Sequence, residues 1–135
     1  MVFLDASAII YLLEGDRTVQ KATQEVLARL SDDQAEPALA ISALSLLKCR
    51  VHPMRKNDHQ QKKRFDNFFS DPGLITIDLT RTIVDQATQL RAQHGLRNPD
   101  ALQAASCLAI SPVTPFVTGD TDFQKLNKLR LHLIQ

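Results

Sequence analysis

Four aspartates follow the apolar segments of this chain in a way that can do chemistry. Asp5 ends the first apolar segment. Asp120 and Asp122 come directly after a second one, residues 115–118, in the stretch TGDTDF, and Asp100 lies in the first turn of a predicted helix. In open parallel sheets, sites form beyond the carboxyl ends of the strands, where the strand order reverses. We therefore expect these carboxylates to converge on one edge of a sheet.

Carboxylates that converge in a cleft do not all stay ionised unless a positive charge lies among them. Mg²⁺ or Mn²⁺ would supply that charge, because carboxylate oxygens and water are the ligands that these ions prefer. A bound divalent ion lowers the pKa of a bound water and stabilises the attacking and leaving oxygens of a phosphodiester. The acids therefore predict metal-dependent phosphodiester hydrolysis.

Each of these acids also has a purely structural interpretation. Asp5 can cap the first helix, and Asp100 can complement the dipole of a helix that opens with an Asn-Pro pair. Asp120 and Asp122 can serve as turn and cap residues. Such roles do not exclude a metal site, because a strand-end acid can both cap a helix and bind an ion. Convergence of the four side chains is the prediction that decides between these interpretations.

The bulk composition sets limits on fold and function. A chain of 135 residues with 44% hydrophobic residues suits one domain, residues 1–135, with a substantial core. A formal net charge of +1 gives no long-range field for a polyanion, so nucleic-acid binding must come from local patches. The two cysteines, Cys49 and Cys107, lack metal-type spacing and are expected to be small buried residues.

Other functional classes receive little support. The N-terminus lacks a basic lead and Asp5 interrupts its apolar run, and no later run approaches the ~20 residues of a membrane span, which predicts a soluble, cytoplasmic protein without membrane contact. With four glycines in the chain and no Gly-rich loop after any predicted strand, a nucleotide-binding domain is disfavoured.

Short apolar segments alternate with helical patterns along the whole chain. Strands are expected at 1–5, 38–42, 73–78, 115–120 and 129–134. Helices are expected at 6–13, 16–30, 43–53, 57–70, 80–95, 98–110 and 123–126, with Ser42 and Asn98 as N-caps and Pro53 as a helix end. This alternation predicts an α/β fold: a mostly parallel sheet of about five strands covered by helices on both faces.

Four segments, in this order, resemble motifs of the PIN-domain family: FLDASAIIYLL, ISALSLL, LRNPDALQAA and FVTGDTDF. The resemblance spans essentially the whole chain and is greatest to the VapC-type toxins of toxin–antitoxin pairs. It implies a parallel sheet with helices on both faces, and RNA cleavage with Mg²⁺ or Mn²⁺ held by a few acids. It also implies a homodimer and a VapB-like antitoxin whose tail lies in the active-site groove.

The resemblance assigns roles to individual residues. Asp5 matches the family's first acid, Asp100 the acid of the PDA motif, and Asp120 the acid that follows the fourth strand. Asp122 matches a nearby acid that members use less uniformly, so the main acid of this pair stays open. Small hydroxyls that often support the site correspond to Ser7 and Thr118.

The family's second acid, a glutamate in the helix after the second strand, falls on Lys48, and residues 41–57 contain no Asp or Glu. The inward face of that helix is expected at Ile41, Leu44, Leu47 and Val51, with Lys48 at its edge. At ~4 Å and an effective dielectric constant near 20, each lysine–carboxylate pair is worth roughly 4 kcal/mol before desolvation is subtracted.

An ammonium group at this position would neutralise the acids, repel a divalent ion and remove one ligand. We therefore expect a toxin ribonuclease that Lys48 inactivates or weakens. The alternative is a non-catalytic PIN-like module that binds RNA or an antitoxin. A third reading is that Lys48 extends along the helix edge into water and the true second acid lies elsewhere.

Partner surfaces are suggested by charge and by apolar excess. Residues 50–64 form the densest basic segment, and its expected contacts to RNA phosphates, with one more from the cleft, are Arg50, Arg55, Lys56 and Arg97. An ordinary solvated helix face explains the same run of charge. Apolar residues near the start of the chain suit an antitoxin or a second subunit, or simply the core: Ile9, Ile10, Leu12 and Leu13.

Overall fold

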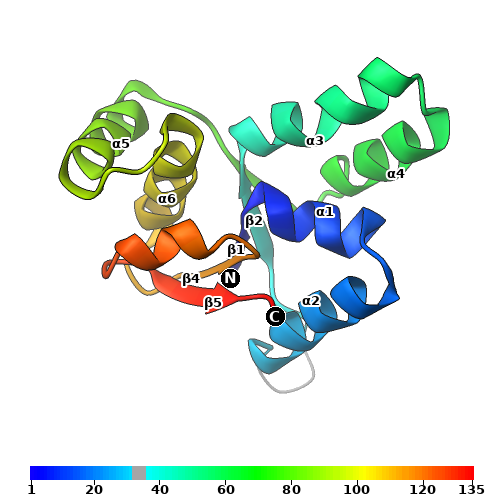
Figure 1. Ribbon diagram of the computed structural model, residues 1–135, viewed down its shortest axis with the longest axis horizontal. Helices are drawn as coiled ribbons and strands as arrows, with labels where there is room; N and C mark the ends of the chain where they lie inside the picture. Colours follow the sequence, from blue (N-terminus) through cyan, green and yellow to red (C-terminus); the bar gives the residue numbers. More distant parts are fainter. Residues whose placement is uncertain (32–35) are drawn as a thin grey trace.

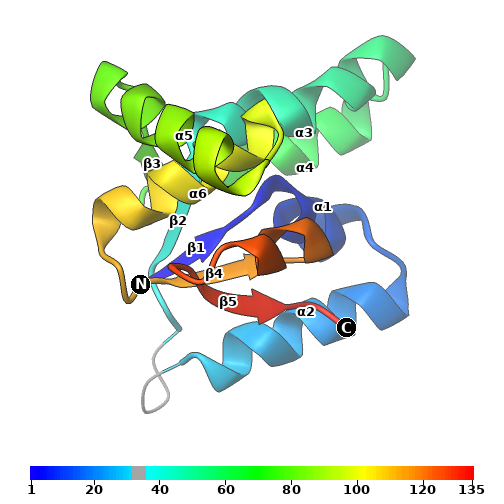
Figure 2. The ribbon, with the colours of Figure 1, turned by 60° about the vertical axis from the view of Figure 1, so that its left-hand side comes forward.

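A five-stranded, fully parallel sheet runs through the middle of the computed structural model, which describes residues 1–31 and 36–135. The strand order is β3-β2-β1-β4-β5, and Figure 1 labels every strand of this order except β3, which is labelled in Figure 2. The strands are β1 (Val2–Leu4), β2 (Leu39–Ser42), β3 (Ile75–Ile77), β4 (Pro115–Thr118) and β5 (Arg130–Leu133). The expected parallel α/β architecture is confirmed.

Helices connect the strands, and side chains cap several of them. They are α1 (Ala6–Glu14), α2 (Arg17–Arg29), α3 (Ala43–Lys56), α4 (His59–Phe69), α5 (Arg81–His94), α6 (Asn98–Ile110) and the 3₁₀ helix η1 (Thr121–Lys125). Asp16, Asp58 and Thr80 each accept a hydrogen bond from the backbone N–H three residues later. The α5 helix ends as expected at Gly95, in the left-handed region at φ 68°.

Each face of the sheet has its own apolar core, because side chains alternate along a strand. Phe3 and Phe116 stack with their ring centroids 5.4 Å apart on the face that α5, α6 and η1 cover. Val2, Leu4 and Val117 point to the other face and pack with α1, α2, α3 and α4. Figure 2 shows α2 on the side of the sheet opposite α5 and α6.

The topology determines where a site can form. The chain builds outward from β1 to β2 and β3, and then returns to the other side of β1 to add β4 and β5. The strand order therefore reverses between β1 and β4, which pair in parallel through Phe3 with Phe116 and Leu4 with Val117. Asp5 and the loop that holds Asp120 leave the sheet at this point, as the sequence predicted.

The sequence prediction for α3 was wrong in two respects. Pro53 does not end the helix: it is buried inside α3, which continues to Lys56. The helix ends instead at Asn57, whose left-handed backbone (φ 51°) turns its N–H back toward the carbonyls of Met54 and Pro53. A proline removes one helical hydrogen bond, and here its ring lies on the buried face, so the helix continues past it.

The inward face of α3 was also misassigned. Leu47 is 61% exposed, Ile41 belongs to β2, and the buried positions of the helix are Ser45, Cys49 and Pro53. Ser45 and Cys49 are small polar or sulfur-containing residues. The leucine and valine pattern of the sequence therefore predicted the wrong face of α3 as the buried one. A smaller correction concerns α6: Asn98 is its first residue, and the capping position belongs to Arg97, whose side chain makes no capping hydrogen bond.

Two further observations concern the cysteines and the helices. Cys49 and Cys107 are buried free thiols as expected, and burial raises the pKa of each to about 12. In the described ranges, 1–31 and 36–135, every helix is too short or too polar to cross a membrane.

Candidate metal centre

Asp5 lies at the end of β1 with its carboxylate buried and held from one side. The hydroxyls of Ser7 and Thr118 approach its Oδ2 at 2.9 and 2.8 Å. Asp5 occupies the N-cap position of α1, but its side chain makes no capping hydrogen bond. Its other oxygen, Oδ1, is buried and lacks a hydrogen-bond partner within the described structure. Asp5 therefore presents a free carboxylate oxygen, which helix capping does not explain.

The same hydroxyls tie the loop after β4 to this end of the sheet. The N–H of Asp120 donates to Thr118 Oγ1 at 3.0 Å, and the N–H of Gly119 donates to Ser7 Oγ at 3.0 Å. Gly119 also lies against the Tyr11 ring, where an added Cβ would overlap the ring atoms. Ser7 and Thr118 thus orient Asp5 and fix the backbone that carries Asp120, which agrees with the supporting role expected for them.

Three of the expected acids form a tight cluster. Carboxylate oxygens of Asp100, Asp120 and Asp122 all lie within 4.8 Å of one another. Asp100 is buried in the first turn of α6, Asp120 is half-buried, and Asp122 is exposed at the start of η1. Asp120 also caps η1, since its Oδ1 accepts the N–H of Asp122 at 2.9 Å. The capping role expected for Asp120 is therefore present, and a ligand role for the same residue stays a prediction.

Arg97 provides the positive charge at this cluster. Its Nε lies 3.3 Å from Asp100 Oδ2, and its Nη2 lies 3.9 Å from Asp120 Oδ2. Burial raises the pKa of Asp100 above its ordinary value, and the Arg97 guanidinium acts against that rise. The neighbouring carboxylates, Asp100 foremost, raise the pKa of Arg97 in turn. A buried acid therefore depends on an exposed cation beside it.

Lys48 is half-buried on α3, near these groups but not paired with them. Over the described ranges, no carboxylate oxygen lies within 4.0 Å of its ammonium nitrogen. The charge of Lys48 still affects the site, because it lowers the pKa of Asp100, although by less than any other group that acts on this carboxyl. The cation in direct contact with the acids is thus Arg97, and the inactivating effect of Lys48 stays a prediction.

The donor set fits a hard divalent cation. It consists of three carboxylates within 4.8 Å of one another, whereas Asp5, whose Oδ1 is unpartnered, lies at the same switch point of the sheet but outside this 4.8 Å group. Oxygen-only donors at the end of a strand are typical of Mg²⁺ or Mn²⁺ sites and unsuited to softer metals. Lys48 occupies the position where the family's second acid was expected, so that ligand is missing from the set.

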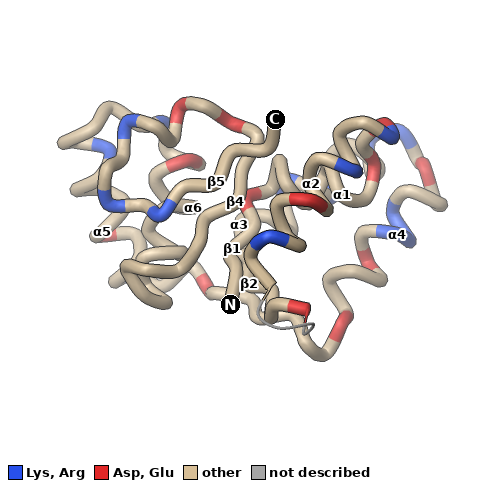
Figure 3. The backbone as a smooth tube through the Cα atoms, turned by 90° about the horizontal axis from the view of Figure 1, so that it is seen from below, with Lys and Arg blue, Asp and Glu red and all other residues tan. Residues whose placement is uncertain are grey.

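Some of the cations expected to contact RNA are paired within the fold, and others are exposed. Arg50 is engaged within the fold: it lies 3.7 Å from Asp66 and its guanidinium carbon is 5.5 Å from the centre of the Phe69 ring. Arg55 and Lys56 are exposed at the end of α3. Arg64, in the same basic segment, is paired with Glu14 through two hydrogen bonds of 2.6 and 2.9 Å. Along α4 the three basic residues 62–64 are followed by one acid, Asp66, and Figure 3 shows charges of both signs on this helix.

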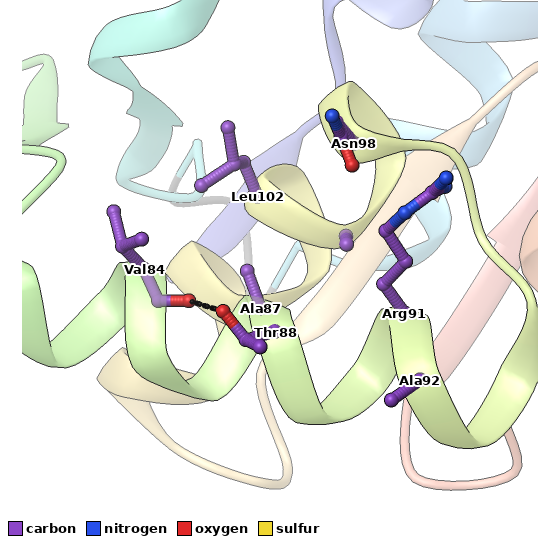
Figure 4. A pocket seen from close by; sticks show the side chains of 8 residues that line it. Val84, Ala87, Thr88, Arg91, Ala92, Asn98 and Leu102 are labelled. Carbon is purple, nitrogen blue, oxygen red and sulfur yellow. Dashed lines mark hydrogen bonds between the residues drawn. The ribbon is translucent and has the colours of Figure 1, made fainter.

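Sequence reasoning missed two other features. Gln103 and Ser45 form a buried hydrogen bond of 3.0 Å between α6 and α3, which joins the helices that carry Asp100 and Lys48. A mostly apolar groove of about 550 Å³ lies between α5 and α6, and its lining includes Val84, Ala87 and Leu102 (Figure 4). None of the four acids lines this groove. An amphipathic α5 with Val84 on its exposed side was the available signal.

Comparison with known protein families identifies the family of this chain. The family profile described as "PIN domain" matches residues 2–129, nearly the entire chain. The protein belongs to the PIN-domain family. This agrees with the order of the four sequence motifs and with the acids found at the switch point of the sheet. No curated protein sequence matches the chain.

Solved structures show the same PIN fold over the full chain. A toxin–antitoxin complex from Klebsiella pneumoniae contains a chain 19% identical to this one, with a TM-score of 0.75 over 100% of this chain and 98% of that chain. VapBC2 from Rickettsia felis, bound to a promoter DNA fragment, gives 22% identity and a TM-score of 0.77 over 100% of both chains. FitAcB from Neisseria gonorrhoeae gives 16% identity and a TM-score of 0.63 over 97% and 96%.

Proposed function

We propose that this PIN domain, one unit over residues 1–135, is the toxin component of a type II toxin–antitoxin system. Its inherited activity is hydrolysis of RNA phosphodiester bonds with Mg²⁺ or Mn²⁺. PIN domains are in general metal-dependent nucleases, and the structures of similar fold include a toxin–antitoxin complex and VapBC2 bound to promoter DNA. The observation that carries the proposal is the cluster of Asp100, Asp120 and Asp122 at the switch point of the sheet, the edge at which Asp5 also leaves β1.

The residues would divide the work as follows. Asp100, Asp120 and Asp122 hold the ion, with Asp5 turning its unpartnered Oδ1 toward the same end of the sheet. Ser7 and Thr118 keep Asp5 and the loop after β4 in place through their hydrogen bonds. A bound divalent ion would supply an activated water and charge stabilisation at the scissile phosphate. Arg55 and Lys56 are free to contact RNA phosphates.

Lys48 is the reason to expect little activity from the chain as it stands. A positive charge replaces a carboxylate ligand, so the local charge changes by two units and a divalent ion is repelled. The long-range effect of Lys48 on Asp100 supports this, although the two groups do not form an ion pair. Lys48 also favours the second candidate, a non-catalytic PIN-like module that retains only its RNA or antitoxin surface.

The test is restoration of the acid. Lys48→Glu should raise the rate of Mn²⁺-dependent cleavage of a single-stranded RNA at least about tenfold, a change equivalent to ~1.4 kcal/mol in the barrier. Lys21→Glu makes the same charge change on the exposed side of α2 and should leave the rate at the wild-type level. Adding Asp100→Asn to Lys48→Glu should abolish the gain, which excludes a contaminating nuclease.

Equal cleavage by wild type and Lys48→Glu, both Asp100-dependent, would show that Lys48 does not disable the site. Absence of cleavage in both would favour the non-catalytic module. The non-catalytic module is tested by measuring partner binding. A VapB-like antitoxin should bind the exposed apolar residues of α1 and α3, including Ile10, Leu47 and Met54. A homodimer is the remaining proposed assembly, and sedimentation of the isolated chain tests it.

A further inference from the structure

Arg97 occupies an unusual place between α5 and α6. It holds the N-cap position of α6 but makes no capping hydrogen bond there. Its guanidinium instead spans two acids of the cluster, Asp100 at 3.3 Å and Asp120 at 3.9 Å. The side chain is 70% exposed, whereas that of Asp100 is 3% exposed. A mobile cation on the surface therefore neutralises a fixed, buried anion.

The contacts of Arg97 are close enough to neutralise the acids and loose enough to be broken. The Nε–Oδ2 distance to Asp100 is at the long end of the hydrogen-bond range, and the Nη2–Oδ2 distance to Asp120 is beyond it. Exposed ion pairs of this kind contribute little, because water and salt screen them. Swinging the guanidinium, which is already exposed, into water breaks its contacts with these two carboxylates. Asp100, by contrast, stays desolvated and needs a positive charge nearby.

We infer that Arg97 is an internal counter-ion that competes with the divalent cation for Asp100 and Asp120. The inference rests on the proposed metal site and concerns how that site is regulated. A divalent ion and the guanidinium need the same two carboxylates, so binding of one displaces the other. Arg97 is then available to contact an RNA phosphate only in the metal-loaded protein, whereas Arg55 and Lys56 are available in both states.

The experiment measures metal binding and apo stability rather than cleavage. Mn²⁺ is titrated calorimetrically into Arg97→Gln, Arg97→Lys and wild type, each also in the Lys48→Glu background. Arg97→Gln should bind Mn²⁺ about threefold to fivefold more tightly, the factor that corresponds to one partly screened ion pair. Arg97→Lys keeps the charge and should remain within about twofold of wild type.

The second readout is thermal unfolding in a chelator. Without metal, Arg97→Gln leaves the buried Asp100 without its partner, so its melting temperature should fall by about 2–5 °C. Added Mn²⁺ should reverse the order, raising the melting temperature of Arg97→Gln more than that of wild type. Arg17→Gln, at the exposed start of α2, is the matched control and should change neither readout.

The outcomes separate the two claims. Equal Mn²⁺ affinity in Arg97→Gln and wild type, together with equal stability in chelator, overturns the counter-ion role and leaves the metal site intact. If no variant binds Mn²⁺ in either background, the proposed metal site fails, and the competition fails with it. If Arg97→Gln shifts both readouts while Lys48→Glu still cleaves no RNA, the counter-ion role holds and the proposed ribonuclease is refuted.

Discussion

Thr118 is fully buried at the end of β4, and its one hydroxyl connects two parts of the candidate centre. It donates to Asp5 Oδ2 at 2.8 Å and accepts the N–H of Asp120 at 3.0 Å. The first of these bonds is charge-assisted and stronger than a neutral one. A single hydroxyl thereby orients one proposed metal ligand and the backbone of another.

Replacing Thr118 by valine keeps the shape of the side chain and removes both bonds. We expect the free energy of unfolding at neutral pH to fall by about 2–3 kcal/mol, because a buried carboxylate and a backbone N–H each lose a partner. Urea denaturation measures this. Thr88→Val is the control: the Thr88 hydroxyl bonds only the Val84 carbonyl on the exposed side of α5 (Figure 4) and should change stability by less than about 0.5 kcal/mol. Equal losses in the two variants would contradict the role given to Thr118.

At the residue level, the sequence was most informative where position along a strand decides the outcome. Asp5 and Asp120 were predictable because each comes directly after a short buried segment at the switch point. The pairing of Arg97 with Asp100 was not predictable, because the pattern of hydrophobic residues contains no information on the rotamer of a long, exposed side chain. The inward face of α3 was missed because Ser45 and Cys49, rather than leucines, occupy its buried positions.

The packing of α1 against the loop after β4 depends on a missing side chain. Gly119 lies where a Cβ would overlap the Tyr11 ring, with ring atom Cζ only 2.9 Å away. The N–H of Gly119 also donates to Ser7 Oγ, so the loop has little freedom to move back. Close approach, rather than an unusual backbone angle, is what requires glycine here.

Gly119→Ala should therefore destabilise the protein by about 1–3 kcal/mol, the usual effect of overpacking. It should also weaken Mn²⁺ binding, because the displaced loop carries Asp120. Thermal unfolding with and without Mn²⁺ measures both effects, and adding Tyr11→Ala should restore the loop by making room for the methyl group. At Gly73 a Cβ would meet only Asp71 Oδ1, at 3.3 Å, so Gly73→Ala is the control. A loss no larger in Gly119→Ala than in Gly73→Ala would contradict this account.

Elements were predictable where caps and apolar periodicity agree. Thr80 and Gly95 define α5, and both acted as the sequence indicated. At α3 the local rule for proline and the tertiary packing disagree, and packing decides: a buried Pro53 is retained inside the helix. The end of that helix, at Asn57, depends on a left-handed residue that the sequence offered without any distinctive pattern.

On the scale of the whole molecule, sheet order follows from connectivity rather than from composition. Helices cover both faces of the sheet and side chains alternate along each strand, so two separate cores form, one on each face. The alternation of Val2, Phe3 and Leu4 between these cores fixes the register of β1. Charge, in contrast, gives no global signal, because the net formal charge is +1.

That near-neutrality leads to a last prediction, on RNA binding. Of the six cations in residues 50–64, the ion pairs of the described structure engage Arg50 with Asp66 and Arg64 with Glu14, which leaves four for phosphates, and in chelator Arg97 is engaged with the acid cluster. Each phosphate neutralised on a single strand adds about −0.7 to the slope of log affinity against log salt. With three or four free contacts, the slope should be about −2 to −3, measured by fluorescence anisotropy between 50 and 200 mM salt in chelator.

The same measurement locates the contacts. Replacing both Arg55 and Lys56 by glutamine should weaken RNA binding and make the slope shallower by about 1.4, because two phosphate contacts are lost. Lys21→Gln, on exposed α2, should leave the slope unchanged. A steep wild-type slope that the Arg55/Lys56 pair does not alter would place the RNA on another surface. Because ion pairs within the fold engage two of the six cations of residues 50–64, the charge count of that segment overstates its electrostatic attraction for RNA.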